Sequence, residues 1–168
     1  RTLDSVTTGT FNTALGYKPL VSTTTGSQNT AIGSNALRNN DNGSLNTAIG
    51  NISMQSNIDG GLNVGVGGWT LNKHKTGDRN VAIGFAAMYN DSIGEYNIAI
   101  GETALLNNKT GTYNTGVGSS TMYNSTTGSN NSTLGANTLF FNTSGQFNTA
   151  TGAASLVNNT NGSYNTAN

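Results

Sequence analysis

The chain has 168 residues, of which only 33% are hydrophobic, and its seven basic residues balance seven acidic ones. So low an apolar fraction argues against a single globular core. The sparse, balanced charge excludes the basic surface used to bind nucleic acid or anionic membranes, so a neutral carbohydrate or protein partner fits better. No cysteine is present, which excludes a disulfide framework and a thiolate metal site. No apolar run is long enough to predict membrane insertion.

One five-residue phrase, Asn29-Thr30-Ala31-Ile32-Gly33, sets the organisation of the whole chain. Its Asn recurs every seventeen residues without insertion or deletion, at positions 12, 29, 46, 63, 80, 97, 114, 131, 148 and 165. A disordered chain of this Asn, Thr and Gly content has no reason to keep such a phase. We divide the chain into a lead-in over residues 1–11 and an array of repeats over residues 12–168, a single elongated domain and fragment of a longer fibre. Positions within a repeat are counted from its Asn, position 0, to position +16.

Each repeat opens with a segment from position 0 to +4 that has the composition of a short strand. Within a strand, +1 and +3 face one way, and 0, +2 and +4 face the other. We assign the aliphatic residue at +3 to the core and expect the glycine at +4 to form a corner. Clear members of these rows are Ile32, Ile49, Ile83 and Ile100 at +3, and Gly33, Gly50, Gly84 and Gly101 at +4.

The second half of the repeat carries Leu or Met at +8, for example Leu37, and a second glycine at +14. Asn, Asp or Thr usually precedes this glycine, which predicts a tight turn with a positive φ angle. A short helix over +6 to +10 is the alternative for this half of the repeat, although the Gly and Thr content disfavours it.

A repeat of this length cannot bury its own apolar side chains, so successive repeats must cover one another. We therefore predict an all-β fold, a β-solenoid or β-roll of about nine 17-residue turns. Asn29, Asn46 and their equivalents at position 0 are expected to form an amide ladder, with a weaker Asn series at +11.

The predicted core is thin, with two large aliphatic side chains in each repeat. Such a column is marginal alone. We expect self-association, with the small residues at +2 and +7 or the variable aromatic positions packing between chains. Replacing Ile83 by Asp is expected to unfold the array or to break the oligomer.

Partner contacts are expected where the repeats differ from one another. Trp69, the only Trp, is the best single candidate. Tyr96 and Tyr113 at +16 and Tyr123 at +9 belong to rows of aromatic residues. Stacked rings of this kind pack against a neighbouring chain or bind sugars, and we favour packing.

His74 is the only histidine and lies in the most charged stretch of the sequence. Stacking places Asp91 one turn later at the same position, +11. Two ligands at one edge do not make a convincing metal site. We interpret this stretch as a solvated loop with an ion pair, keep His74 as a candidate contact residue, and expect no catalytic residue, metal or cofactor.

The phrase Asn-Thr-Ala-Ile-Gly resembles the motif repeated through the heads of trimeric autotransporter adhesins, the YadA-like β-roll. Similar units are found in tail-fibre proteins of phages and large viruses and in bacterial surface proteins. The resemblance spans residues 11–165, although a unit of seventeen residues is longer than is usual in those heads. It implies a parallel homotrimer in an extracellular setting, on a cell surface or a virion.

The expected function is therefore that of a non-enzymatic fibrous or adhesive segment, which presents or spaces a surface that binds a host glycan or protein. Nucleic acid and membrane insertion are not expected. Ice binding is the alternative, because position +1 carries Thr in many repeats, although Val64, Val81 and Ile98 interrupt the row. A solenoid enzyme of the polysaccharide-lyase or acyltransferase kind has only His74 and scattered carboxylates in its favour.

Overall fold

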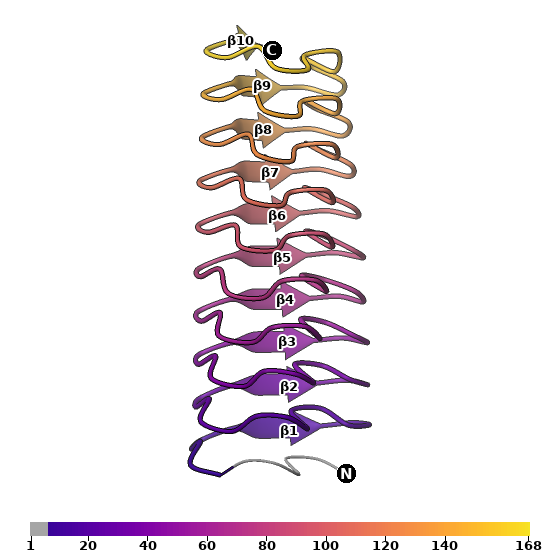
Figure 1. The fold of residues 1–168 in the computed structure, drawn as a ribbon. Helices are drawn as coiled ribbons and strands as arrows, with labels where there is room; N and C mark the ends of the chain where they lie inside the picture. The colour runs from indigo at the N-terminus through magenta and orange to yellow at the C-terminus, as the bar shows by residue number, and fades with distance from the viewer. Residues whose placement is uncertain (1–6) are drawn as a thin grey trace.

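The computed structural model describes residues 7–168, which form one straight column of stacked turns with the first and last described turns at opposite ends (Figure 1). Each turn contributes one short strand, and the strands form a single ten-stranded sheet in sequence order. The strands are β1 (Thr13–Leu15), β2 (Thr30–Ile32), β3 (Thr47–Ile49), β4 (Val64–Val66), β5 (Val81–Ile83), β6 (Ile98–Ile100), β7 (Thr115–Val117), β8 (Ser132–Leu134), β9 (Thr149–Thr151) and β10 (Thr166–Ala167). The predicted β-solenoid is confirmed.

Every strand pairs in parallel with the equivalent residues of the next turn, as in Ala31 with Ala48. The segments between strands are paired as well. The amide of Leu37, for example, donates to the carbonyl of Ser53 at 3.0 Å. Backbone hydrogen bonds between turns therefore continue around the column, which satisfies buried backbone groups in segments that are not strands.

No helix occurs over +6 to +10 in any repeat of the described chain, so the helical alternative is wrong. Across residues 7–168 no helix is long and apolar enough to cross a membrane. The part of the lead-in from residue 7 onward already follows the column, because the amides of Thr7, Thr8 and Gly9 donate to the carbonyl of Thr24. Residues 1–6 of the predicted lead-in lie outside the described residues.

The strands face the opposite way from our prediction. In β6 the middle residue, Ala99, is buried, whereas Ile98 and Ile100 are 38% and 37% exposed. The assignment of +3 to the core is wrong for Ile32, Ile49, Ile83 and Ile100, which all lie on the outer face of the sheet. The small residues at +2 and +7 are interior, so they do not form the expected contact surface between chains.

The asparagine at position 0 explains this orientation. The side-chain amide of Asn46 donates to the carbonyl of Gly60 at 2.8 Å, and its backbone amide donates to Oδ1 of Asn29 at 2.9 Å. Both partners lie in the interior, so position 0 must point inward. Because side chains alternate along a strand, +2 then also points inward and +3 points outward.

The interior combines an apolar and a polar half. In the apolar half, Leu and Met at +8 pack on Ala at +2 and on the small residues at +7. In the polar half, the row at +11 contributes a second amide, so that Asn46 and Asn57 both donate to the carbonyl of Gly60. Hydrogen-bonded amides thus fill the volume that a sequence so poor in apolar residues leaves open.

The residue at +8 has a left-handed backbone in every repeat, with φ from 46° at Leu71 to 54° at Leu139. A β-branched residue is strongly disfavoured in this region. The row accordingly consists of Leu and Met and contains no Val or Ile.

The two glycine rows have different causes. Gly67 at +4 has a φ of 131°, and a Cβ there would lie 2.7 Å from the carbonyl oxygen of Gly84. Gly111 at +14 has no positive φ, so our expectation of such a turn is wrong for this row. A Cβ on Gly111 would lie 2.3 Å from both Oδ1 of Asn108 and the carbonyl oxygen of Gly128. Close stacking therefore requires glycine at +14.

Candidate functional site

A groove runs along the column on its loop side. Most of it is lined by side chains at +10 and +12, which project outward on either side of the buried position +11, and one part is lined mainly by residues at +5, +6 and +9. Three hollows make up the groove, and each shares lining residues with the next. We name them the aromatic, lysine and polar hollows.

The aromatic hollow has a volume of about 420 Å³ and is lined mainly by Trp69, Phe85, Tyr89, Asn90, Thr103 and Leu106. The ring centroids of Trp69 and Tyr89 are 5.8 Å apart with an angle of 31° between the ring planes. Both rings thus present apolar faces beside the lysine hollow, on the same turns of the column, and the predicted candidate Trp69 is 37% exposed there.

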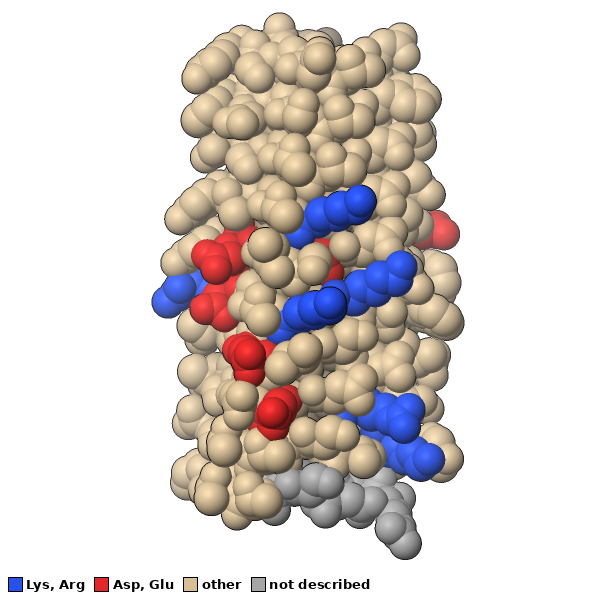
Figure 2. Space-filling view, viewed as in Figure 1, with Lys and Arg blue, Asp and Glu red and all other residues tan. Residues whose placement is uncertain are grey.

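The lysine hollow shares Asn90 with the aromatic hollow and has a volume of about 490 Å³. Its lining consists of Lys73, Lys75, Asn90, Ser92, Asn107 and Lys109. Figure 2 shows basic side chains at mid-height on this face, beside a file of acidic ones. The ion pair found within residues 7–168 joins His74 and Asp91, so these ammonium groups have no carboxylate partner within the described chain.

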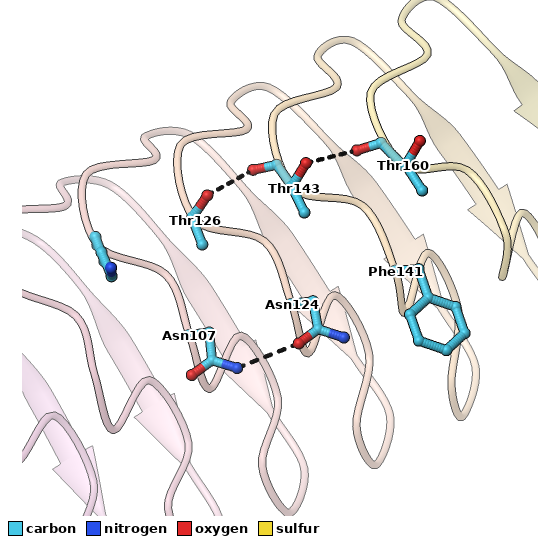
Figure 3. A pocket seen from close by; sticks show the side chains of 7 residues that line it. Asn107, Asn124, Thr126, Phe141, Thr143 and Thr160 are labelled. Atoms are coloured by element: carbon cyan, nitrogen blue, oxygen red, sulfur yellow. Dashed lines mark hydrogen bonds between the residues drawn. The ribbon is translucent and has the colours of Figure 1, made fainter.

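The polar hollow, with a volume of about 460 Å³, shares Asn107 and Lys109 with the lysine hollow (Figure 3). It adds Asn124, Thr126, Phe141, Thr143 and Thr160. Hydrogen bonds between turns hold these side chains in place: Asn107 donates to Oδ1 of Asn124 at 3.4 Å, and the hydroxyl of Thr126 donates to the carbonyl of Thr143 at 3.0 Å. Each amide and hydroxyl keeps further donor or acceptor capacity for a ligand.

His74 does not reach the groove. Its ring lies inside the column with no exposed surface, Nε2 is 2.7 Å from the carbonyl oxygen of Gly77, and Nδ1 is 3.3 Å from Oδ2 of Asp91. The other carboxylate oxygen of Asp91 accepts hydrogen bonds from the amide of Gly94 and from Asn108. His74 thus replaces one asparagine of the +11 row, and the interpretation of His74 and Asp91 as part of a solvated loop is wrong.

The remaining candidate residues lie elsewhere on the column. The rings of Tyr96 and Tyr113 stack at 4.8 Å, and Arg79 donates to the hydroxyl of Tyr96 at 2.6 Å. Tyr123 stacks on Phe140 at 5.0 Å. None of these three tyrosines lines the groove. Within residues 7–168 no group of three metal-ligating side chains is found.

The groove contains residues that the sequence analysis did not single out, above all Lys75 and Lys109. A signal for them exists in the sequence, because both occupy +12 and are two repeats apart. Tyr89, by contrast, belongs to the aromatic row at +9 that the sequence predicts as a contact surface, and it lines the aromatic hollow.

Comparisons with protein-family models, with curated proteins and with solved structures found no match to this chain. The geometry and chemistry of the column are therefore the basis for assigning a function.

Proposed function

We propose that this chain is a non-enzymatic fibrous segment of an extracellular adhesin or viral tail fibre, which self-associates as a parallel homotrimer and presents or spaces a receptor-binding surface. The observation that carries the proposal is the outer face of the sheet. The resemblance of the repeat to trimeric adhesin heads and tail fibres supports the setting and the number of chains.

The outer face of the sheet is aliphatic along its central third. In β4, β5 and β6, both outward-facing residues of every strand are Val or Ile, namely Val64, Val66, Val81, Ile83, Ile98 and Ile100. No described strand carries a charged residue on this face. Contiguous exposed apolar surface of this kind marks a protein contact.

A second copy of the chain fits this face better than an unrelated partner does. Because all turns have the same length, two parallel copies in register bring each row against the equivalent row over the whole column. The aliphatic centre of one copy then meets the aliphatic centre of the other, and the Thr-rich ends also coincide. Three such faces around a common axis would shield the apolar patch of every chain.

Light scattering after size-exclusion chromatography tests the proposal. We expect a mass three times that of the 17.2 kDa chain. Ile83→Asp should give a folded monomer, because Ile83 faces outward and a charge there prevents apolar contact between chains. The matched control is Thr110→Asp, which adds the same charge at an exposed corner and should leave the trimer intact. A wild-type chain that stays monomeric at high concentration would contradict the proposal.

Ice binding is the second candidate, because the structure turns the Thr-bearing row at +1 outward on the sheet face. Thr13, Thr30 and Thr47 lie on one side of the aliphatic centre, and Thr115, Ser132 and Thr149 lie on the other. Measurement of thermal hysteresis on the wild-type chain, whose outer face is unaltered, decides between the two. Arrest of ice growth would favour this candidate.

A further inference from the structure

We propose that the groove binds an extended acidic oligosaccharide, with the sugar chain parallel to the column axis. This inference rests on the proposed adhesive function and names the ligand class of its receptor-binding surface. The groove lies on the side away from the outer face of the sheet, so self-association through that face leaves the groove open.

The repeat of the groove matches that of an extended sugar chain. Parallel strands are about 4.8 Å apart, which is close to the length of one pyranose residue in an extended β-linked glycan. From the turn of Trp69 to that of Thr160 the lining residues span six turns. Consecutive sugars can therefore meet equivalent side chains on consecutive turns, which suits a hexasaccharide.

The positions of the lysines favour a ligand with a negative charge on alternate sugars. Lys75 and Lys109 belong to the same row and are two turns apart, with Ser92 between them. A uronic acid at every second sugar would place one carboxylate beside each ammonium group. Because no carboxylate of the described chain pairs with these lysines, their charges are free to bind such a ligand.

The aromatic hollow adds a subsite for an uncharged sugar face. Trp69 and Tyr89 expose ring faces there, and apolar C–H faces of pyranose rings stack on such surfaces. The Nζ atom of Lys73 lies 5.1 Å from the centroid of the Tyr89 ring, which joins the aromatic hollow to the lysine hollow. Because Trp69 and Lys75 belong to the same turn, a sugar stacked on Trp69 would lie beside the sugar that pairs with Lys75, as a branch of the main chain would.

The polar hollow supplies hydroxyl and amide groups that are already in place. Asn107 donates to Oδ1 of Asn124 at 3.4 Å, and Thr143 donates to the carbonyl of Thr160 at 3.0 Å. Side chains ordered before binding lose little conformational freedom when a ligand arrives. Their remaining hydrogen-bonding capacity suits the hydroxyl groups of a sugar.

Nucleic acid is a poorer fit. A polynucleotide carries a charge on every unit and needs a dense basic surface, whereas the groove offers three lysines over six turns and the chain has no net charge. Low charge density together with hydroxyl and amide groups therefore favours an acidic glycan.

The test measures binding of three probes to the full chain: a hexasaccharide of alternating glucuronate and N-acetylglucosamine, a neutral N-acetylglucosamine hexasaccharide, and a thymidine hexanucleotide. Quenching of Trp69 fluorescence reports on occupancy of the aromatic hollow, because Trp69 is the only Trp. Calorimetry gives the affinities. Three variants are compared with wild type: Lys75→Gln with Lys109→Gln, Trp69→Ala, and the matched control Lys18→Gln with Arg38→Gln, which removes two positive charges away from the groove.

We expect the acidic hexasaccharide to bind in preference to the other two probes. The double lysine variant should lose about tenfold or more in affinity, and the control should lose less than about threefold. Trp69→Ala should also weaken binding. The proposal is overturned if the acidic probe does not bind, if the lysine and control variants lose affinity equally, or if the hexanucleotide binds more tightly than the acidic sugar.

The oligomeric state distinguishes the two proposals. A trimer that binds none of the probes overturns the groove assignment and leaves the fibre proposal standing. A wild-type monomer that binds the acidic probe through Lys75 and Lys109 overturns the trimer proposal and supports the groove assignment.

Discussion

The two long faces of the column have the same period but opposite chemistry. The outer face of the sheet carries no charge in the described strands, and its residues at +1 and +3 of the complete repeats are only Thr, Ser, Val, Ile and Leu. The groove face carries Lys, Asn, Ser, Thr and Phe at +10 and +12 within a few turns. The similar residues at +1 and +3 can contact the same rows of an identical copy along the whole column. The residues at +10 and +12 differ from turn to turn, so they can form a binding site at one particular height. On this difference rest our two proposals, that the sheet mediates self-association and that the groove binds a ligand.

The largest expected loss of stability comes from changing the buried pair His74 and Asp91, which lies beneath the groove. Asp91→Ala leaves the buried His74 without its carboxylate partner, which should cost about 3 to 5 kcal/mol in free energy of unfolding. Replacing both residues by Asn restores the amide row at +11 and should cost less than about 1 kcal/mol. Urea unfolding of the monomeric Ile83→Asp background measures both. Equal losses in the two variants would contradict the account of the pair.

The next largest expected effect is the difference in stability loss between a substitution in the interior and one on the outer face of the sheet. Leu105 at +8 is fully buried, so Leu105→Ala should cost about 2 to 5 kcal/mol in the same unfolding experiment. Ile100→Ala, on the outer face of the adjacent strand, should cost less than about 1 kcal/mol in the monomer. A larger loss of stability for Ile100→Ala than for Leu105→Ala would show that the residue at +3 belongs to the core.

Two neighbouring glycines, Gly67 and Gly68, test why glycine is required at the corner that follows each strand. Gly67→Ala should cost about 1 to 3 kcal/mol, because it places a side chain at a φ of 131° and against the backbone of the next turn. A Cβ on Gly68 meets only ordinary contacts, the nearest at 3.6 Å, so Gly68→Ala should change stability by less than about 1 kcal/mol. Thermal unfolding would reveal the contrast, and similar melting temperatures would argue against it.

The smallest expected loss of stability comes from the exposed tyrosine row at +16, which lies just before the strand. Tyr96→Ala removes the stacked pair with Tyr113 and should cost about 0.5 to 1.5 kcal/mol. It should leave the affinity for the acidic hexasaccharide unchanged, because Tyr96 does not line the groove. Loss of sugar binding in this variant would instead place the ligand on the tyrosine row.

The sequence alone predicts the stacking, the parallel register and the burial of Leu37 and its equivalents, because a fixed period places equivalent residues of successive repeats over one another. The orientation of the sheet could not be predicted from hydrophobicity, since Ile at +3 is more apolar than Ala at +2. What decides it is a contact between distant parts of the repeat, from the amide of Asn46 to the carbonyl of Gly60.

The candidate site shows the same limit. The charged neighbours of His74 suggested solvent exposure, but its register in the +11 row places it inside the column. Trp69 could be recognised because it is unique, whereas Lys75 and Lys109 acquire meaning only when +10 and +12 are known to project outward on either side of a buried residue.

Disulfide cross-linking of single-cysteine variants tests most directly whether the sheet and the groove have different roles, since the chain has no cysteine of its own. Under mild oxidation, Ile83→Cys on the outer face of the sheet should form disulfide-linked chains, because parallel copies bring this position together. Ser92→Cys in the groove should remain uncross-linked. Efficient cross-linking through Ser92→Cys with none through Ile83→Cys would contradict the assignment of the two faces.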